Sequence, residues 1–203
     1  MVSRKQRQQK KAANRNKRVA KEKHREKVPP KPPSRYTNRY ATPDLLVAGG
    51  PLVNAQWSLP LLLEQRMHSL GLPIPAPVFG YLLLDTGDSR TCISQQAAAE
   101  LGLQPLRLQQ SYGAGGLYQA PVYRVRLTIG LRGPSMTTEM HWETEAQEVP
   151  RLEESIMPFG ITVAGHAARL IGLLGRDLLR HAKVNYNGLN GHFEMYFDLK
   201  SFS

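Results

Sequence analysis

The sequence predicts a mostly β domain with two or three short helices, preceded by a basic tail. From about residue 50 the chain consists of short apolar segments separated by glycine and proline, which is typical of β proteins. Only three short stretches carry helix signals. Near the end, Asn187-Gly188 and Asn190-Gly191 lie between two runs of strand-forming residues and predict a closing hairpin.

The first strands and helices follow from apolar runs and their end signals. A helix is expected after Pro60, which suits a first turn, and it should stop at Gly71. A second helix should be capped by Ser94 and end at Gly102. The expected strands between and around them are 50–60, 79–85 and 91–94.

The second half of the domain reads as hairpins and one further helix. Residues 111–130 predict a long hairpin whose tip holds Gly113, Gly115 and Gly116, and residues 135–145 continue the sheet. Residues 169–182 predict a strand, a glycine turn and a short helix. Segment 148–170 begins with a poorly patterned connection that the sequence does not place.

The charge of the chain is concentrated in its N-terminal tail. Residues 1–39 hold 15 Lys and Arg against 2 Glu, whereas the other 164 residues hold 12 basic and 14 acidic side chains. Residues 4–27 have no large apolar side chain except Val19, so we expect them to be disordered, with a proline-rich spacer after them. We therefore divide the chain into a tail and linker, 1–40, and a domain, 41–203.

A basic cluster gains affinity for polyanions by releasing counterions. Residues 4–39 are therefore expected to bind nucleic acid or another polyanion, or else to act only as a solubilising tail. The single cysteine, Cys92, excludes an internal disulfide framework and a multi-cysteine metal site. With no apolar run near the roughly 20 residues that span a bilayer, we expect an intracellular, cytoplasmic protein without a membrane span.

In the segment Y-L-L-L-D-T-G, residues 81–87, an apolar strand is followed directly by an acidic residue and then by a turn. Burial penalises a carboxylate charge, so Asp85 needs either a structural partner or a chemical purpose. The structural alternative is that Asp85 caps its own turn through backbone N–H groups. Taken alone, the glycine-tipped hairpin is an ordinary turn, and Arg176 and Asp177 are the start of a helix.

Together, three motifs resemble the retropepsin-like aspartic proteases, the single-domain relatives of retroviral protease. They are the apolar strand with Asp85-Thr86-Gly87, the glycine hairpin, and a G-R-D segment preceded by two leucines. The resemblance covers roughly residues 50–199 and is greatest for cellular and bacterial members. It implies the closed β-barrel or sandwich of the acid protease fold.

The resemblance also implies a function, an aspartic endopeptidase acting on peptides or proteins. Two carboxylates must share a proton, and this chain has one D-T-G, so a homodimer would bring one Asp85 from each chain to the two-fold axis. Thr86 would brace the two loops and Gly87 would let backbones approach. Water is the nucleophile, so no metal or organic cofactor is expected. The implied flap residues are Tyr112, Gly113, Ala114, Gly115 and Gly116, and the implied supporting residues are Leu174, Gly175, Arg176 and Asp177, with Arg176 as an ion-pair residue.

One residue departs from the family pattern, because Asp88 stands where Ala or Ser usually follows D-T-G. Like-charge repulsion from a third carboxylate should move activity toward neutral pH, unless Arg90 or Arg176 neutralises it. The alternative is a catalytically silent dimer that binds peptides or proteins and is held on nucleic acid or a ribosome by its tail. A further alternative makes the tail the main function and the domain a dimeriser. Cys92 is expected to be a core residue.

Overall fold

The computed structural model describes residues 35–39, 43–113, 116–132, 137–152, 162–163, 166–167 and 169–197. The chain divides into two units, 1–32 and 33–203, and all described residues belong to the second. The predictions for residues 1–34 therefore lie outside the described residues. Among those described, no helix is long and apolar enough to cross a membrane.

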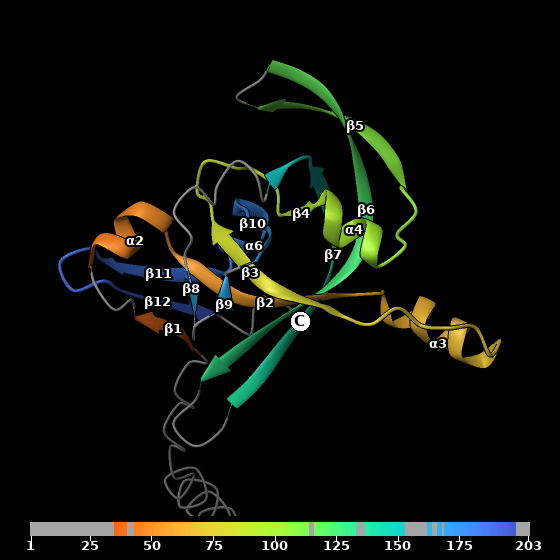
Figure 1. The fold of residues 1–203 in the computed structure, drawn as a ribbon, viewed down its shortest axis with the longest axis horizontal. Coiled ribbons are helices and arrows are strands. Elements are labelled where there is room, and N and C mark those ends of the chain that lie inside the picture. The colour runs from red at the N-terminus through yellow and green to blue at the C-terminus, as the bar shows by residue number, and fades with distance from the viewer. Residues whose placement is uncertain are drawn as a thin grey trace, which may run out of the picture. The chain divides into compact units, whose positions relative to one another are not determined.

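Six strands close into a barrel, as expected for the acid protease fold (Figure 1). Around the ring the order is β6-β2-β3-β10-β4-β7, and β7 pairs back with β6 through an antiparallel register that includes Leu127 opposite Trp142. The strands are β2 (Leu52–Ser58), β3 (Val78–Leu84), β4 (Cys92–Ser94), β6 (Gly116–Arg132), β7 (Thr137–Val149) and β10 (Leu170–Leu174). The mostly β, closed-barrel prediction is confirmed.

Strand β10 lies between β3 and β4 and brings two distant segments together. It runs parallel to β3, with Leu174 opposite Leu84, and antiparallel to β4, with Leu173 opposite Cys92. A Cβ on Gly172 would lie 2.1 Å from the carbonyl oxygen of Cys92, so only glycine permits this approach of β10 to β4. The C-terminal ends of β3 and β10 therefore lie side by side.

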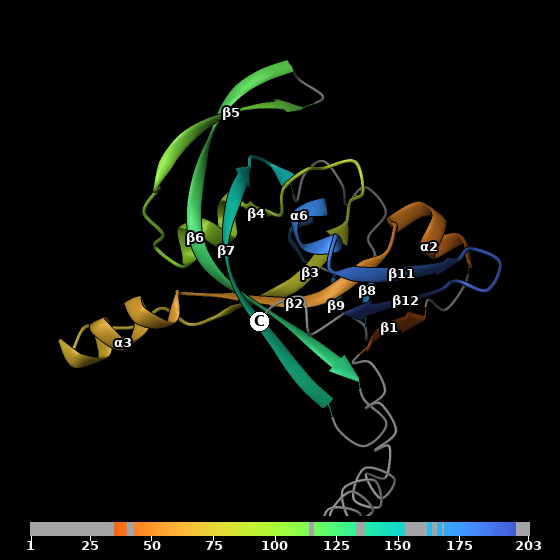
Figure 2. The ribbon, with the colours of Figure 1, turned by 180° about the vertical axis from the view of Figure 1, so that it is seen from behind.

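The predicted hairpin is formed by β5 (Arg107–Gly113) and the first part of β6, which pair in register up to Gly113 opposite Gly116. The two tip residues, Ala114 and Gly115, lie outside the described residues. Figures 1 and 2 show this hairpin curving away from the barrel as a long two-stranded extension.

The described residues contain four short helices, one more than expected. The additional helix, α2 (Pro43–Gly49), precedes β2; the others are α3 (Leu61–Ser69), α4 (Gln95–Glu100) and α6 (Arg176–Leu179). Ser94 caps α4 as predicted, since its hydroxyl accepts a hydrogen bond from the N–H of Ala97 at 3.1 Å. Helix α3 buries none of its residues and projects away from the barrel (Figure 1).

A second group of strands continues the sheet from β6. It contains β1 (Arg35–Arg39), β12 (His192–Phe197) and β11 (Ala182–Asn187), the last two forming the predicted closing hairpin. Residues 35–39 were expected in the tail and linker, yet they pair antiparallel with β12. Tyr36 explains this, because its ring is buried and its hydroxyl bonds the backbone of Leu52 and Asn54 in β2.

The core fills the barrel and reaches under β12. Trp57 is fully buried, and its indole N–H donates to the carbonyl of Ile171 at 3.0 Å. The rings of Trp142 and Phe197 pack with centroids 5.1 Å apart. In segment 148–170 the short strands β8 (Thr162–Val163) and β9 (His166–Ala167) pair with each other, and residues 153–161 lie outside the described residues.

Candidate active site

Asp85 follows β3 directly, at the point where β3 and β10 end together. Its N–H donates to the carbonyl of Leu174 at 3.0 Å, which fixes the start of the turn to the end of β10. Its Oδ1 accepts the N–H of Gly87 at 2.8 Å. This is the turn-capping contact that the structural alternative predicts. It leaves Oδ2 of the half-buried carboxyl without a hydrogen bond among the described residues.

Arg176 holds the Asp85 turn from the other side. Its guanidinium donates to the carbonyl oxygens of Thr86 at 2.8 Å and Gly87 at 3.1 Å. Its own N–H donates to the carbonyl of Asp88 at 3.0 Å. Among the described residues Arg176 forms no ion pair, and its role as an ion-pair residue that supports the loop and the dimer stays a prediction. The reason that no ion pair forms here is geometric, because the turn presents backbone carbonyls rather than a carboxylate to the helix that carries Arg176.

A buried threonine connects the segment after the turn to α6. The hydroxyl of Thr91 donates to Oδ1 of Asp177 at 2.7 Å and accepts the N–H of Gly175 at 3.2 Å. Oδ1 of Asp177 also accepts the N–H of Leu178 in the first turn of α6. A Cβ on Gly175 would lie 2.2 Å from the carbonyl oxygen of Arg90, so glycine is required there. Thr91 was not among the predicted site residues, and its signal in the sequence is a polar residue at the start of a predicted strand.

Asp88 is held by neutral donors rather than by an arginine side chain. Its carboxylate accepts the backbone N–H of Arg90 at 3.2 Å and the thiol of Cys92 at 3.3 Å. Within the described part of the chain, neither Arg90 nor Arg176 forms an ion pair with it. The pKa of the Cys92 thiol is raised above its ordinary value of 9.0, mainly because the thiol is buried and secondly because of the charge of Asp88. Cys92 is buried and stays protonated, which fits its predicted place in the core.

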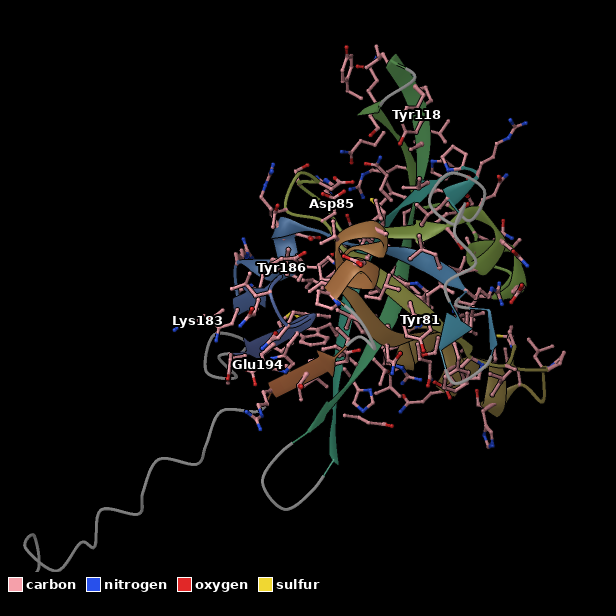
Figure 3. The ribbon with its side chains drawn as sticks, turned by 60° about the vertical axis from the view of Figure 1, so that its left-hand side comes forward. Tyr81, Asp85, Tyr118, Lys183, Tyr186 and Glu194 are labelled. Atoms are coloured by element: carbon pink, nitrogen blue, oxygen red, sulfur yellow. The ribbon has the colours of Figure 1, made fainter. Side chains whose placement is uncertain are left out.

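The turn forms the floor of a pocket of about 540 Å³ whose opposite wall is the β5–β6 hairpin. Figure 3 shows Asp85 beneath the hairpin that carries Tyr118. Both sets of alternating residues on β5 border the pocket, but Gln109, Ser111 and Gly113 are half-buried, whereas Tyr112 is 83 % exposed. The lining residues are Asp85, Gly87, Asp88, Ser89, Arg90, Gln109, Gln110, Ser111, Tyr112, Gly113, Tyr118, Gln147, Val149, Leu173 and Arg176.

The predicted site residues thus come together around one pocket, with some exceptions. Thr86 is exposed beside the pocket, and Leu174, Gly175 and Asp177 support its floor from behind. Gly116 pairs with Gly113 at the described end of the hairpin. Several lining residues were not predicted, among them Arg90, Gln109, Ser111 and Gln147, although the alternation that places Gln109 and Ser111 beside Gly113 was readable in the sequence.

Comparison with known families agrees with this geometry. Residues 80–178 match the model of a family described as aspartyl protease, which is related to the retropepsins. The matched range contains the Asp85 turn, the hairpin and the G-R-D segment, and the resemblance seen in the sequence is confirmed. No curated protein sequence matches the chain.

Proposed function

We propose that the protein is a homodimeric aspartic endopeptidase that uses Asp85 from each chain, because residues 80–178 match the model of an aspartyl protease family. One observation supports this above the others: Asp85 lies on the floor of a pocket beneath a hairpin able to cover a bound peptide. Its backbone is fixed by β10, and its turn is held by Arg176. Such fixation suits a group that must act in one geometry.

In the proposed reaction the two carboxylates share one proton. Asp85 of one chain, ionised, takes a proton from a water molecule, which then attacks the carbonyl carbon of the scissile peptide. The partner subunit's Asp85, protonated, donates its proton toward the carbonyl oxygen. The β5–β6 hairpin would order the peptide and exclude water. Thr86, exposed beside the turn, is proposed to brace the two loops across the axis.

The first test is cleavage of a peptide library, read by mass spectrometry from pH 4 to 8. Wild type should cut and Asp85→Asn should not, because the amide cannot act as a base. Asp44→Asn is the matched control, since it makes the same chemical change on an exposed residue of α2 away from the pocket. Equal cleavage by wild type and Asp85→Asn would refute the proposal.

A mixing experiment tests the shared site directly. If each site needs two Asp85 carboxylates, equal amounts of wild type and Asp85→Asn that exchange subunits should leave only about a quarter of the dimers active. A site contained within one chain would instead retain half of the activity. Sedimentation of the same mixture establishes whether dimers are present.

The Asp88 carboxylate leads us to propose activity nearer neutral pH than is usual for an acid protease. Asp88→Asn removes the charge and keeps one acceptor oxygen, which can still accept the N–H of Arg90, whereas its amide nitrogen cannot accept the thiol of Cys92. It should therefore move the alkaline limb of the kcat/KM profile to lower pH. Full activity at pH 3–4 with none at pH 6 would contradict this.

Asp88 also favours a second candidate function, a catalytically silent dimer that binds peptides or proteins. In this case neither wild type nor Asp85→Asn would cut while both remain dimeric. We also propose that residues 4–39 bind nucleic acid or another polyanion in the cytoplasm. Loss of RNA or DNA binding on deletion of residues 4–34, which leaves strand β1 in place, measured at two salt concentrations, is the test.

A further inference from the structure

The pocket beneath the hairpin is unusually polar for a site that would bind extended peptides. Its apolar side chains are few, chiefly Val149 and Leu173 apart from the two tyrosines. Five uncharged polar side chains line the walls and make no side-chain hydrogen bond within the part of the chain that the structure describes. They are Ser89, Gln109, Gln110, Ser111 and Gln147. Unused donors and acceptors in a pocket indicate a polar occupant.

Arg90 is the lining cation whose charged group remains available. Its backbone is fixed, because its N–H bonds Asp88 and its carbonyl accepts the thiol of Cys92. Its guanidinium has no hydrogen bond or ion pair among the described residues. The other lining cation, Arg176, is already occupied by the carbonyls of the Asp85 turn. Arg90 is thus a half-buried cation whose guanidinium makes no hydrogen bond or ion pair with the described residues, although its charge acts on Glu145.

Arg90 belongs to a group of three arginines that act on one glutamate. Glu145 is the nearby acid, and a hydrogen bond from Arg107 at 2.6 Å is the main reason its pKa is lowered. Arg124 and Arg90 lower the pKa of Glu145 further through their charges. Three arginines therefore act on one glutamate near Arg90, while the Asp88 carboxylate, two residues before Arg90, accepts its backbone N–H rather than its guanidinium.

We propose that Arg90 selects peptides with an acidic side chain, in a subsite that it forms with Gln147 and Gln109. The inference rests on the proposed function, since it names the substrate class of that same site. Gln147 lies beside Arg90 because its N–H bonds the carbonyl of Thr91 at 3.2 Å. A guanidinium binds a carboxylate with two parallel hydrogen bonds, and the glutamine amides supply further donors.

Selection of a basic side chain by Asp88 is the competing possibility. The Asp88 oxygens already accept an N–H and an S–H from the protein, which lowers their capacity for a ligand. The Arg90 guanidinium has no such partner. The structure therefore favours an acidic over a basic side chain.

The test uses two measurements so that this inference and the protease proposal can fail separately. The first is the kcat/KM of wild type for Ala-rich octapeptides that carry Glu, Gln or Lys at one position at a time. The second is the affinity of Asp85→Asn for the same fluorescein-labelled peptides, which needs no catalysis. At one position Glu should be preferred over Gln by about three- to tenfold, as expected for a partly exposed charge pair, and salt should weaken the preference.

Substitutions then assign the preference to Arg90. Arg90→Gln should remove the preference for Glu, and Arg90→Glu should reverse it in favour of Lys. Arg124→Gln is the matched control: it removes the same charge beside Glu145, but Arg124 does not line the pocket. The control should keep the wild-type preference.

Each outcome decides one of the two proposals. Cleavage or binding without a Glu preference, a Lys preference in wild type, or a Glu preference that survives in Arg90→Gln would overturn the inference. Cleavage of neutral peptides in those cases would leave the protease proposal intact. A Glu preference in binding that depends on Arg90, with no cleavage by wild type, would support the inference and refute the protease proposal.

Discussion

Replacing Thr91 by valine tests whether the floor of the pocket is held by one hydroxyl. Thr91 is fully buried, and its hydroxyl links Asp177 and the N–H of Gly175. Valine has nearly the same shape, so the change removes two hydrogen bonds without opening a cavity. Both partners belong to the segment from which Arg176 holds the Asp85 turn.

The magnitude follows from what each partner loses. A hydrogen bond to a charged acceptor contributes about 1.5–3 kcal/mol, and a buried N–H left without an acceptor costs about 1–3 kcal/mol. Part of the first loss is recovered, because Asp177 keeps its bond from Leu178 and is only partly buried. We therefore expect Thr91→Val to lower the free energy of unfolding by about 2–4 kcal/mol.

Urea unfolding in the Asp85→Asn background, at one fixed protein concentration, provides the measurement without self-cleavage. Thr91→Ser is the control, because it keeps both hydrogen bonds and loses one methyl group, at a cost of about 1 kcal/mol. If Thr91→Val lowers the free energy of unfolding by less than about 1 kcal/mol, or if the two variants lower it equally, the Thr91 hydroxyl does not stabilise the floor of the pocket.

Other expected outcomes concern the thiol, the close contacts and acid. Cys92 should resist iodoacetamide at pH 8 in the native protein and react after unfolding, since its thiol is buried and its pKa is raised; rapid native alkylation would contradict its burial. Gly172→Ala should unfold the protein or lower its free energy of unfolding by more than about 3 kcal/mol. Gly130→Ala is the control: a Cβ there meets no atom within 4 Å, so stability should change by less than about 1 kcal/mol. Similar losses for the two variants would show that the close approach of β10 to β4 at Gly172 does not require glycine. The free energy of unfolding should fall slightly below pH 4.5, because hydrogen bonds hold the pKa values of three carboxylates below that figure in the folded state. The stability that these carboxylates contribute is present above pH 4.5 and is lost as the pH falls through their folded-state pKa values. A urea midpoint that stays constant from pH 5 to 3 would refute this prediction. The carboxylates and their donors are Glu100 with Arg169, Glu145 with Arg107, and Glu194 with Tyr196.

The sequence predicted best the features that are decided within a few residues. The cap of α4 by Ser94 and the left-handed glycines at Gly102 and Gly191 follow from local backbone chemistry. The strand that ends at Asp85 and the hairpin facing it were found because three motifs matched a family together. Each of these signals needs no knowledge of where distant segments lie.

The features that the sequence did not predict depend on distant partners. Strand β1 forms because Tyr36 packs under β2 and because β12, at the other end of the domain, offers a free edge. The leucines of α3 look like a core stripe, yet none of them is buried by the described residues, and Leu62 is 76 % exposed. Arg176 bonds carbonyls rather than an acid because the shape of a turn 90 residues earlier presents them.

The parallel pairing of β3 with β10 also sets an order of events during synthesis. Asp85 leaves the ribosome long before Leu174 and Arg176, the residues that fix its N–H and hold its turn. A nascent chain that ends before residue 170 contains the D-T-G triplet but lacks the strand and helix that shape it. Contacts between segments so far apart form late in folding. The pocket floor is therefore completed only when most of the domain has been made, which delays any chemistry at Asp85 until the barrel can close.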